Sequence, residues 1–287
     1  MSTRTGLIGL ALILSWQYAA WSFPCYLGEA LRLAEGTVCS ARPRQSQLLG
    51  TQRSLFTVDT TSREEVRNFF NAVYAESENV DPEWTGDVST CSSGTTSERF
   101  RNAVLLRVNW VRALAGVPAW VTFDHTYNTK AQQMALMLSA NRAASHYPPP
   151  TWKCYTEDGA EAAANSNLAL GSYGPDAIVR YIEDFGSFNS AVGHRRWILY
   201  PQTRVMGTGD IPSNPHGPPS NTLWILDSYA NQVRPATREP YVAWPPPGYV
   251  PYQVVFARWS FAYPKADFSA ATVTMASNGV PCLLYTS

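Results

Sequence analysis

Apolar residues recur at helical spacing in three segments of the chain, residues 60–77, 95–116 and 127–138. Side chains three and four positions apart lie on one face of a helix, so each segment predicts a helix with a buried apolar face. The first two begin with a threonine and a glutamate three residues apart, which is the spacing of a capping box. These pairs are Thr61 with Glu64 and Thr95 with Glu98. We interpret the apolar faces as core.

The segments with a regular apolar pattern are shorter in the second half of the chain. Residues 174–186 begin with Gly-Pro-Asp and end in glycine, which predicts a short helix with proline in its first turn. Residues 197–201, 204–209 and 222–227 are short apolar runs that each predict a strand. From Glu239 onward, β-forming residues are punctuated by turn residues, without a helical period. This order of elements predicts an α+β fold followed by a β-rich C-terminal extension.

Five parts follow from these patterns. We predict a signal peptide over residues 1–22, a lead-in with one helix over 23–95, a folded domain over 96–235 and a truncated β-rich extension over 236–281. The last six residues, CLLYTS, can be encoded by a common sequencing adaptor. We therefore interpret residues 282–287 as an artefact of sequence assembly.

The first residues have the pattern of an export signal. Arg4 precedes an uncharged run of eleven residues from Gly6 to Trp16, and Ala20-Trp21-Ser22 fits a small-x-small cleavage site. A membrane anchor is the alternative, but eleven residues fall short of the ~20 that span a bilayer as a helix. We expect a secreted, extracellular protein with no transmembrane span in the mature chain.

Charge and cysteine content narrow the class of protein. The 287 residues include 22 basic and 22 acidic side chains, whereas a nucleic-acid binder needs a basic excess, so we expect no nucleic-acid partner. The five cysteines form no C-x-x-C pair, which argues against a thiolate zinc site. Disulfides are the expectation for an exported chain. Cys25 with Cys39 and Cys91 with Cys154 are candidate pairs, although the sequence does not fix the pairing.

Four histidines are candidates for chemistry. His146 follows the third predicted helix and His194 precedes the first predicted strand, and residues at such element ends are well placed to line a pocket. His125, just before a helix, and His216, among prolines, fit surface positions. With a nearby carboxylate, His146 and His194 can form an open zinc site with a position for water, or a metal-free hydrogen-bonded cluster.

Several short motifs occur in an order that resembles one family. A helix with N-x-x-R precedes a glycine stop, a later helix ends near Ser-His, and a histidine is followed nine residues on by a threonine and then by M-G-x-G. These residues are Asn109, Arg112, Gly116, Ser145, His146, His194, Thr203, Met206, Gly207 and Gly209. In this order they are similar to the CAP superfamily of cysteine-rich secretory proteins, antigen 5 allergens and pathogenesis-related proteins, in a bacterial-like branch.

The resemblance covers about Val104 to Asp210 and implies a three-layer α-β-α sandwich with a surface cleft. It also implies that the cleft gathers two histidines, at the positions of His146 and His194, and that these can bind zinc or another divalent cation.

The resemblance further implies two acids in the cleft. Asp184 matches one of them. Ser166 stands where the family has a glutamate, and Glu161, upstream on what we expect to be the same helix, is the candidate to replace it.

Three functional hypotheses remain at this point. The first, implied by the resemblance, is a secreted protein that binds a metal, a small apolar ligand such as a sterol or lipid, or an extracellular protein. The second is an extracellular metal-dependent hydrolase or protease with Asp184 or Glu161 as general base. The third makes the histidines structural. The sequence contains no H-E-x-x-H, G-x-S-x-G or Walker motif, so we favour binding over catalysis.

Overall fold

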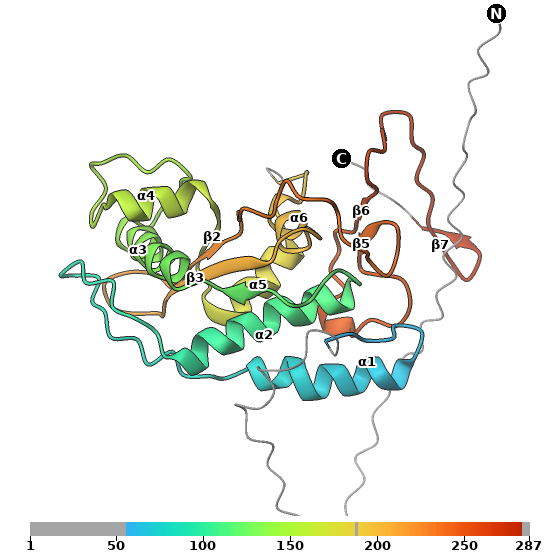
Figure 1. Ribbon diagram of the computed structural model, residues 1–287, viewed down its shortest axis with the longest axis horizontal. Coiled ribbons are helices and arrows are strands. Elements are labelled where there is room, and N and C mark those ends of the chain that lie inside the picture. Colours follow the sequence, from blue (N-terminus) through green and yellow to red (C-terminus); the bar gives the residue numbers. More distant parts are fainter. Residues whose placement is uncertain (1–55, 187–188, 283–287) are drawn as a thin grey trace, which may run out of the picture. The chain divides into compact units, whose positions relative to one another are not determined.

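The computed structural model describes residues 56–186 and 189–282 (Figure 1). The chain divides into two compact units, one of residues 49–264 and one that includes residues 265–287. In the second unit, the described residues form a small hairpin of β7 (Ala276–Ser277) and β8 (Val280–Pro281). The predicted signal peptide, both Cys25 and Cys39, and residues 283–287 lie outside the described residues.

A four-stranded sheet is the centre of the larger unit. Its strands are β1 (Thr122–Phe123), β2 (Ser166–Leu170), β3 (Val205–Ile211) and β4 (Ser220–Trp224), in the spatial order β1-β3-β4-β2. The β1–β3 pair is parallel and the other two pairs are antiparallel. The strands predicted at 204–209 and 222–227 are therefore confirmed as parts of this sheet. The order places β2 at one edge.

Two helices cover one face of this sheet, α3 (His125–Asn141) and α4 (Glu157–Ala164) (Figure 1). Helix α3 approaches β3 so closely that only glycine fits beneath it. A Cβ atom at Gly209 would lie 2.1 Å from the carbonyl carbon of Ala131, and one at Gly207 would lie 2.5 Å from the Cβ atom of Tyr127. The two glycines of the M-G-x-G motif thus serve helix–sheet packing.

The opposite face carries α2 (Glu98–Leu114) and α5 (Gly174–Glu183), which pack on each other. The side chains of the strands alternate between the two layers: Leu223 joins the core with α2 and α5, and its neighbour Trp224 joins the core with α3 and α4. The larger core is built from side chains such as Trp110, Leu114, Ile178, Ile182 and Met206. The predicted α+β class, as a three-layer α-β-α sandwich, is confirmed.

The predicted helices are present, but their first residues differ from the prediction. The first helix begins as α1 (Arg63–Phe69) and continues as a π-helical turn, η2 (Phe70–Tyr74), and a 3₁₀ turn, η3 (Ala75–Ser77). Its N-cap is Ser62, which accepts a hydrogen bond from the backbone N–H of Glu65 at 3.2 Å. Ser97 caps α2 in the same way. Each helix therefore begins one or two residues later than the threonine–glutamate pairs predicted.

The strand predicted at residues 197–201 is wrong. The chain forms a short helix there, α6 (Gly193–Ile198), which contains His194. Helical spacing turns Arg195, Ile198 and Leu199 into the interior and leaves Trp197 39% exposed. A strand would have placed Trp197 and Leu199 on the same face.

The segment after the sheet packs within the same unit. Strands β5 (Val242–Trp244) and β6 (Ser260–Ala262) pair antiparallel, and the 3₁₀ turn η4 (Tyr252–Val254) lies between them. Trp244 and Val254 are both 1% exposed and belong to the core that α2 and α5 share. Residues 236–264 are thus packed against the sandwich. Within the residues described here, no helix is long and apolar enough to cross a membrane.

A disulfide joins Cys91 to Cys154, as predicted for this pair. Cys91 lies in a turn closed by the Asp87–Ser92 bridge, and Cys154 lies between α3 and α4. Near it, Val88, Leu136 and Ile211 form a small core cluster. The bond therefore fixes the loop that follows His146 to the segment before α2.

Candidate functional site

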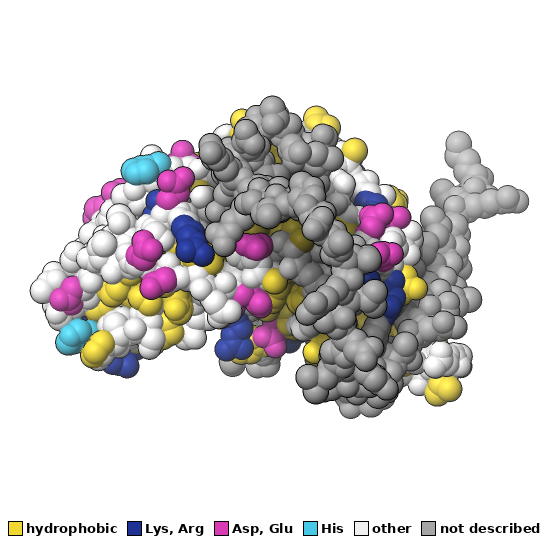
Figure 2. All heavy atoms as spheres, turned by 90° about the horizontal axis from the view of Figure 1, so that it is seen from below, with side chains coloured by type: hydrophobic (Ala, Val, Ile, Leu, Met, Phe, Trp, Pro, Cys, Tyr) yellow, Lys and Arg dark blue, Asp and Glu magenta, His cyan; other side chains and the backbone are white. Residues whose placement is uncertain are grey.

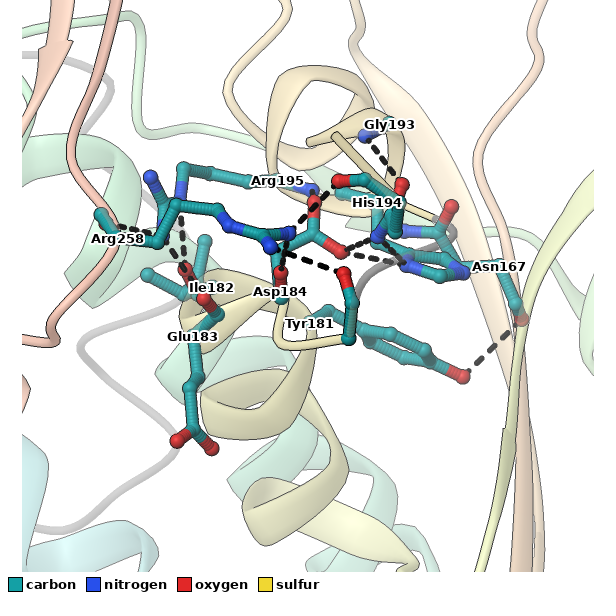
Figure 3. Close-up of polar contacts among 11 residues, drawn as sticks. Asn167, Tyr181, Ile182, Glu183, Asp184, Gly193, His194, Arg195 and Arg258 are labelled. Carbon is teal, nitrogen blue, oxygen red and sulfur yellow. Dashed lines mark hydrogen bonds and ion pairs between the residues drawn. The ribbon is translucent and has the colours of Figure 1, made fainter. Parts of the chain in front are cut away.

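His194 and Asp184 form the centre of the site (Figure 3). Asp184 is the C-cap residue of α5, and His194 is the second residue of α6. Nδ1 of His194 lies 2.8 Å from Oδ1 of Asp184, whose side chain is completely buried while that of His194 is 34% exposed. A carboxylate only accepts, so Nδ1 carries the hydrogen of this bond and Nε2 is the ring nitrogen left for a ligand. The side-chain nitrogen of Asn189 also lies 3.0 Å from Nδ1.

Further donors fix the Asp184 carboxylate. The backbone N–H of Arg195 donates to Oδ2 at 3.1 Å, and the side-chain amide of Asn189 donates to the same Oδ1 atom that His194 uses. Oδ1 of Asn189 in turn accepts from the backbone N–H of Gly193 at 3.2 Å. The carboxylate is therefore occupied by neighbouring groups and has the role of orienting the imidazole.

Two non-glycine residues with left-handed backbone flank this part of the site. Asp184 has φ 53° and ψ 48°, and Val192 has φ 47° and ψ 48°. For a β-branched residue such as Val192 this conformation is a clear outlier. Such backbone costs on the order of 1–3 kcal/mol and persists where the surroundings enforce it, typically at functional sites.

His146 is held in a simpler way. Its Nδ1 lies 2.7 Å from the carbonyl oxygen of Ala163, in the last turn of α4, and the residue is exposed. Carbonyls in the last turn of a helix lack partners within the helix, and this one accepts a hydrogen bond from the ring N–H. His146 therefore has the same tautomer as His194, with the lone pair on Nε2.

Both histidines are tied to the segment 163–167, which connects α4 to the edge strand β2. The ring of His146 binds the carbonyl of Ala163, and the side chain of Asn167 donates to the backbone carbonyl of His194 at 3.0 Å. Tyr181 lies beneath the second histidine, with ring centroids 5.4 Å apart. Its hydroxyl donates to the carbonyl of Asn167 at 3.1 Å, and burial raises the pKa of this phenol well above its usual value.

The second predicted acid lies elsewhere. Oε2 of Glu161 is 2.5 Å from Nζ of Lys130 on α3, and the carboxylate is about half exposed. Glu161 belongs to α4 whereas Ser166 begins β2, so the expectation that both lie on one helix is wrong. Ser166 is 4% exposed, and its hydroxyl has no hydrogen-bond partner among the described residues. Of the two acids, the structure brings only Asp184 against a histidine.

Two arginines that the sequence analysis missed hold the backbone around Asp184. Arg195, on α6, donates to the carbonyls of Ile182 (2.5 Å) and Glu183 (2.9 Å), and Arg258 donates to the carbonyls of Asp184 (2.8 Å) and Asn189 (2.8 Å) (Figure 3). Burial lowers the pKa of Arg195 to about 10. Arg258 lies 74 positions after Asp184, and no local pattern marked it.

Arg112, one of the motif residues, is also completely buried. Its guanidinium donates to the carbonyls of Pro118 (2.7 Å), Ile198 (2.5 Å) and Thr203 (3.1 Å). Burial lowers its pKa to about 9. Arg112 therefore fixes the chain that leaves α6 and enters β3, and it joins two motifs that lie far apart in the sequence.

The other two histidines of the described residues lie elsewhere. His125 begins α3 and His216 lies in the loop between β3 and β4. Among the residues that the structure describes, no three or more His, Cys, Asp or Glu side chains gather into a metal-binding group. On the face shown in Figure 2, acidic and basic side chains are interspersed.

Two hollows lie away from the histidines. One, of about 390 Å³, is lined by residues that include Tyr74, Tyr173 and Arg180. The other, of about 310 Å³, is mainly apolar, and Phe56 and Trp120 are among its lining residues. The two histidines line neither hollow.

Comparison with known proteins agrees with this architecture. A search of curated proteins finds no match. The model of the cysteine-rich secretory protein family, CAP, matches residues 105–225, a range that includes His146, Asp184 and His194. Residues 105–225 of this chain are therefore similar to the cysteine-rich secretory protein family.

Proposed function

We propose that this chain is an extracellular CAP-domain protein that binds a divalent metal ion, with zinc as the preferred ion, through Nε2 of His146 and Nε2 of His194. One observation carries the proposal. In both rings, Nδ1 is bound to an acceptor, Ala163 O at 2.7 Å and Asp184 Oδ1 at 2.8 Å, which leaves both Nε2 lone pairs for a ligand.

The donor set fits such an ion. Metal-binding histidines commonly donate their other ring N–H to a carboxylate or a backbone carbonyl, which fixes the tautomer and raises the basicity of the ligand nitrogen. Here one histidine has a carboxylate and the other a carbonyl. Neutral imidazole suits zinc, and two protein ligands leave positions for water or for a bound molecule. When bound, zinc would supply Lewis-acid polarisation of that molecule.

The positions of the acids favour binding over hydrolysis. A general base must have a free oxygen that faces the reacting water. The oxygens of Asp184 accept from His194, Asn189 and Arg195, and Glu161 pairs with Lys130. Each of the two acids that the hydrolase hypothesis offers as general base is therefore engaged with other groups.

Extracellular location is the second part of the proposal. It is supported by the Cys91–Cys154 disulfide, because disulfides persist in oxidising compartments, and by the apolar run near the N-terminus. A sterol, a lipid or an extracellular protein as partner stays a prediction, as does the bacterial-like branch of the family.

A zinc titration tests the metal site. Isothermal calorimetry on the full chain is compared with a double variant, His146→Gln/His194→Gln, and with a matched control, His125→Gln/His216→Gln, which removes the other two of the four histidines. We expect one zinc per chain in the parent and in the control, and loss of binding in the first variant. Equal binding by the two double variants, or no binding by the parent, would refute the proposal.

A further inference from the structure

The chain beyond the CAP match reaches back to the site. Residues 226–264 lie outside the matched range, yet they supply Arg258, which precedes β6. Nη1 of Arg258 donates to the carbonyls of Asp184 and Asn189, both at 2.8 Å, and Nη2 donates to the carbonyl of Gly186 at 2.9 Å. Three backbone carbonyls around the Asp184 carboxylate thus converge on one guanidinium.

Arg195 extends this contact into a continuous network. Its guanidinium donates to the carbonyl of Arg258 at 2.9 Å and to the hydroxyl of Ser260 at 2.9 Å, as well as to the carbonyls of Ile182 and Glu183. Arg195 and Arg258 together, which we call the arginine brace, bind five carbonyls between residues 182 and 189. Hydrogen bonds from charged donors are stronger than those from neutral ones.

The brace acts where the backbone is strained. Asp184 adopts the left-handed conformation, and its own carbonyl is one of the groups that Arg258 holds. The carboxylate of Asp184 lies 2.8 Å from Nδ1 of His194, so its position decides which ring nitrogen carries the hydrogen of that bond. A carboxylate or a carbonyl that is fixed in place fixes the ring that donates to it.

We infer that Arg258 is a positioning residue for the His194 half of the site: it holds the Asp184 carboxylate in line with Nδ1 and thereby keeps Nε2 of His194 free and directed at a ligand. The expected effect on metal affinity rests on the proposed function. The expected effect on the tautomer of His194 does not depend on it. It makes the segment after the CAP match a component of the site.

The test uses three variants of the full chain. Arg258→Met removes the guanidinium and keeps the apolar stem, and Arg258→Lys keeps the charge with fewer donors. Arg196→Met is the matched control: this arginine is exposed on α6, next to the site, and no hydrogen bond or ion pair joins its side chain to another described residue. Each of the three variants replaces one arginine near Asp184.

The first readout is the tautomer of His194, from long-range ¹H–¹⁵N spectra of the metal-free protein at about pH 8, above the ordinary pKa of histidine. We expect the Nδ1–H form in the parent and in Arg196→Met. In Arg258→Met, we expect a mixture with the Nε2–H form, and Arg258→Lys should fall between. The ring of His146, which the brace does not touch, should be unchanged and reports whether the protein is folded.

The second readout is zinc affinity. Loss of a group that orients a metal ligand typically lowers affinity about 10–100-fold. We expect the loss of zinc affinity in Arg258→Met to lie in this range, Arg258→Lys to recover part of the loss, and Arg196→Met to equal the parent.

If the parent binds no zinc, the proposed function fails, while the tautomer of His194 still decides whether Arg258 is a positioning residue. A His194 ring that keeps the Nδ1–H form in folded Arg258→Met would overturn the inference. Should Arg258→Met not fold, Arg258→Lys decides in the same way.

Discussion

The two histidine regions of this molecule are held by different kinds of interaction. His194 lies on α6 beside a completely buried carboxylate, and two arginines from α6 and from the segment before β6 bind the surrounding carbonyls. His146 lies in the loop between α3 and α4, where one ring hydrogen bond and a disulfide eight residues further along fix its position. One region depends on a buried polar network and the other on a covalent link.

This difference indicates that the two rings contribute to binding in different ways. A buried network holds a ligand group in one orientation because every donor has a fixed partner. A loop fixed at one point permits small displacement. We expect His194 to set the position of a bound ion and His146 to adjust to it.

The largest effect is expected from removal of the disulfide. Cys91→Ser/Cys154→Ser opens a loop with a sequence separation of 63, for which loop-closure entropy gives about 4 kcal/mol of stability. Urea unfolding of the parent and of the double variant measures the loss. Zinc affinity should fall while the tautomer of His194 stays unchanged. A changed tautomer would mean that the two regions are not independent.

The next effect concerns the arginine brace. Arg195→Met leaves the carbonyls of Ile182, Glu183 and Arg258 without their buried donor, and one such unsatisfied group costs ~1–3 kcal/mol. We expect a total loss of about 3 kcal/mol in the free energy of unfolding. Arg196→Met should stay within about 0.5 kcal/mol of the parent, as exposed substitutions do. Equal stability of the two variants would contradict a structural role for the network.

A smaller effect is expected from the acid itself. Asp184→Asn keeps the shape of the side chain but can turn an amide N–H toward Nδ1 of His194, which favours the other tautomer. We expect zinc affinity to fall about 10–100-fold. A calorimetric titration measures it, with urea unfolding to separate affinity from stability. An unchanged affinity would show that the carboxylate does not orient the ring.

The smallest effect is expected at Glu161. Its carboxylate is about half exposed and pairs with Lys130, and exposed ion pairs contribute about 0–1 kcal/mol. Glu161→Gln should leave zinc affinity within about twofold of the parent and lower stability only slightly. A tenfold loss of affinity would mean that this acid reaches the histidines after all, and it would restore the hydrolase hypothesis.

Long periodic elements were predictable from the sequence. Helices α2 and α3 follow from their apolar patterns, because the periodicity extends over enough residues to distinguish helix from strand. Strands β3 and β4 were predicted from short apolar runs. Helix α6 was not predictable from the sequence, because such a short apolar run fits either a helix or a strand. What decides it is the burial of Arg195 against distant carbonyls, which no local pattern contains.

The site was predictable only where residues are fixed by neighbours in sequence. Asp184 and His194 are ten positions apart and lie in contact, and their role in a binding cleft stays a prediction. Glu161 was a reasonable substitute for the acid missing at Ser166, but the end of α4 at Ala164 separates their elements. Arg258 could not be found, because its role depends on a segment that folds back over 74 positions.

The most direct test of the metal site is anomalous diffraction at the zinc absorption edge from crystals of the zinc-loaded protein. The account predicts one strong peak at ~2.0–2.1 Å from both Nε2 of His146 and Nε2 of His194, with the two Nδ1 atoms still bound to Ala163 and Asp184. A peak bound to other side chains, or no peak between these two rings, would contradict it.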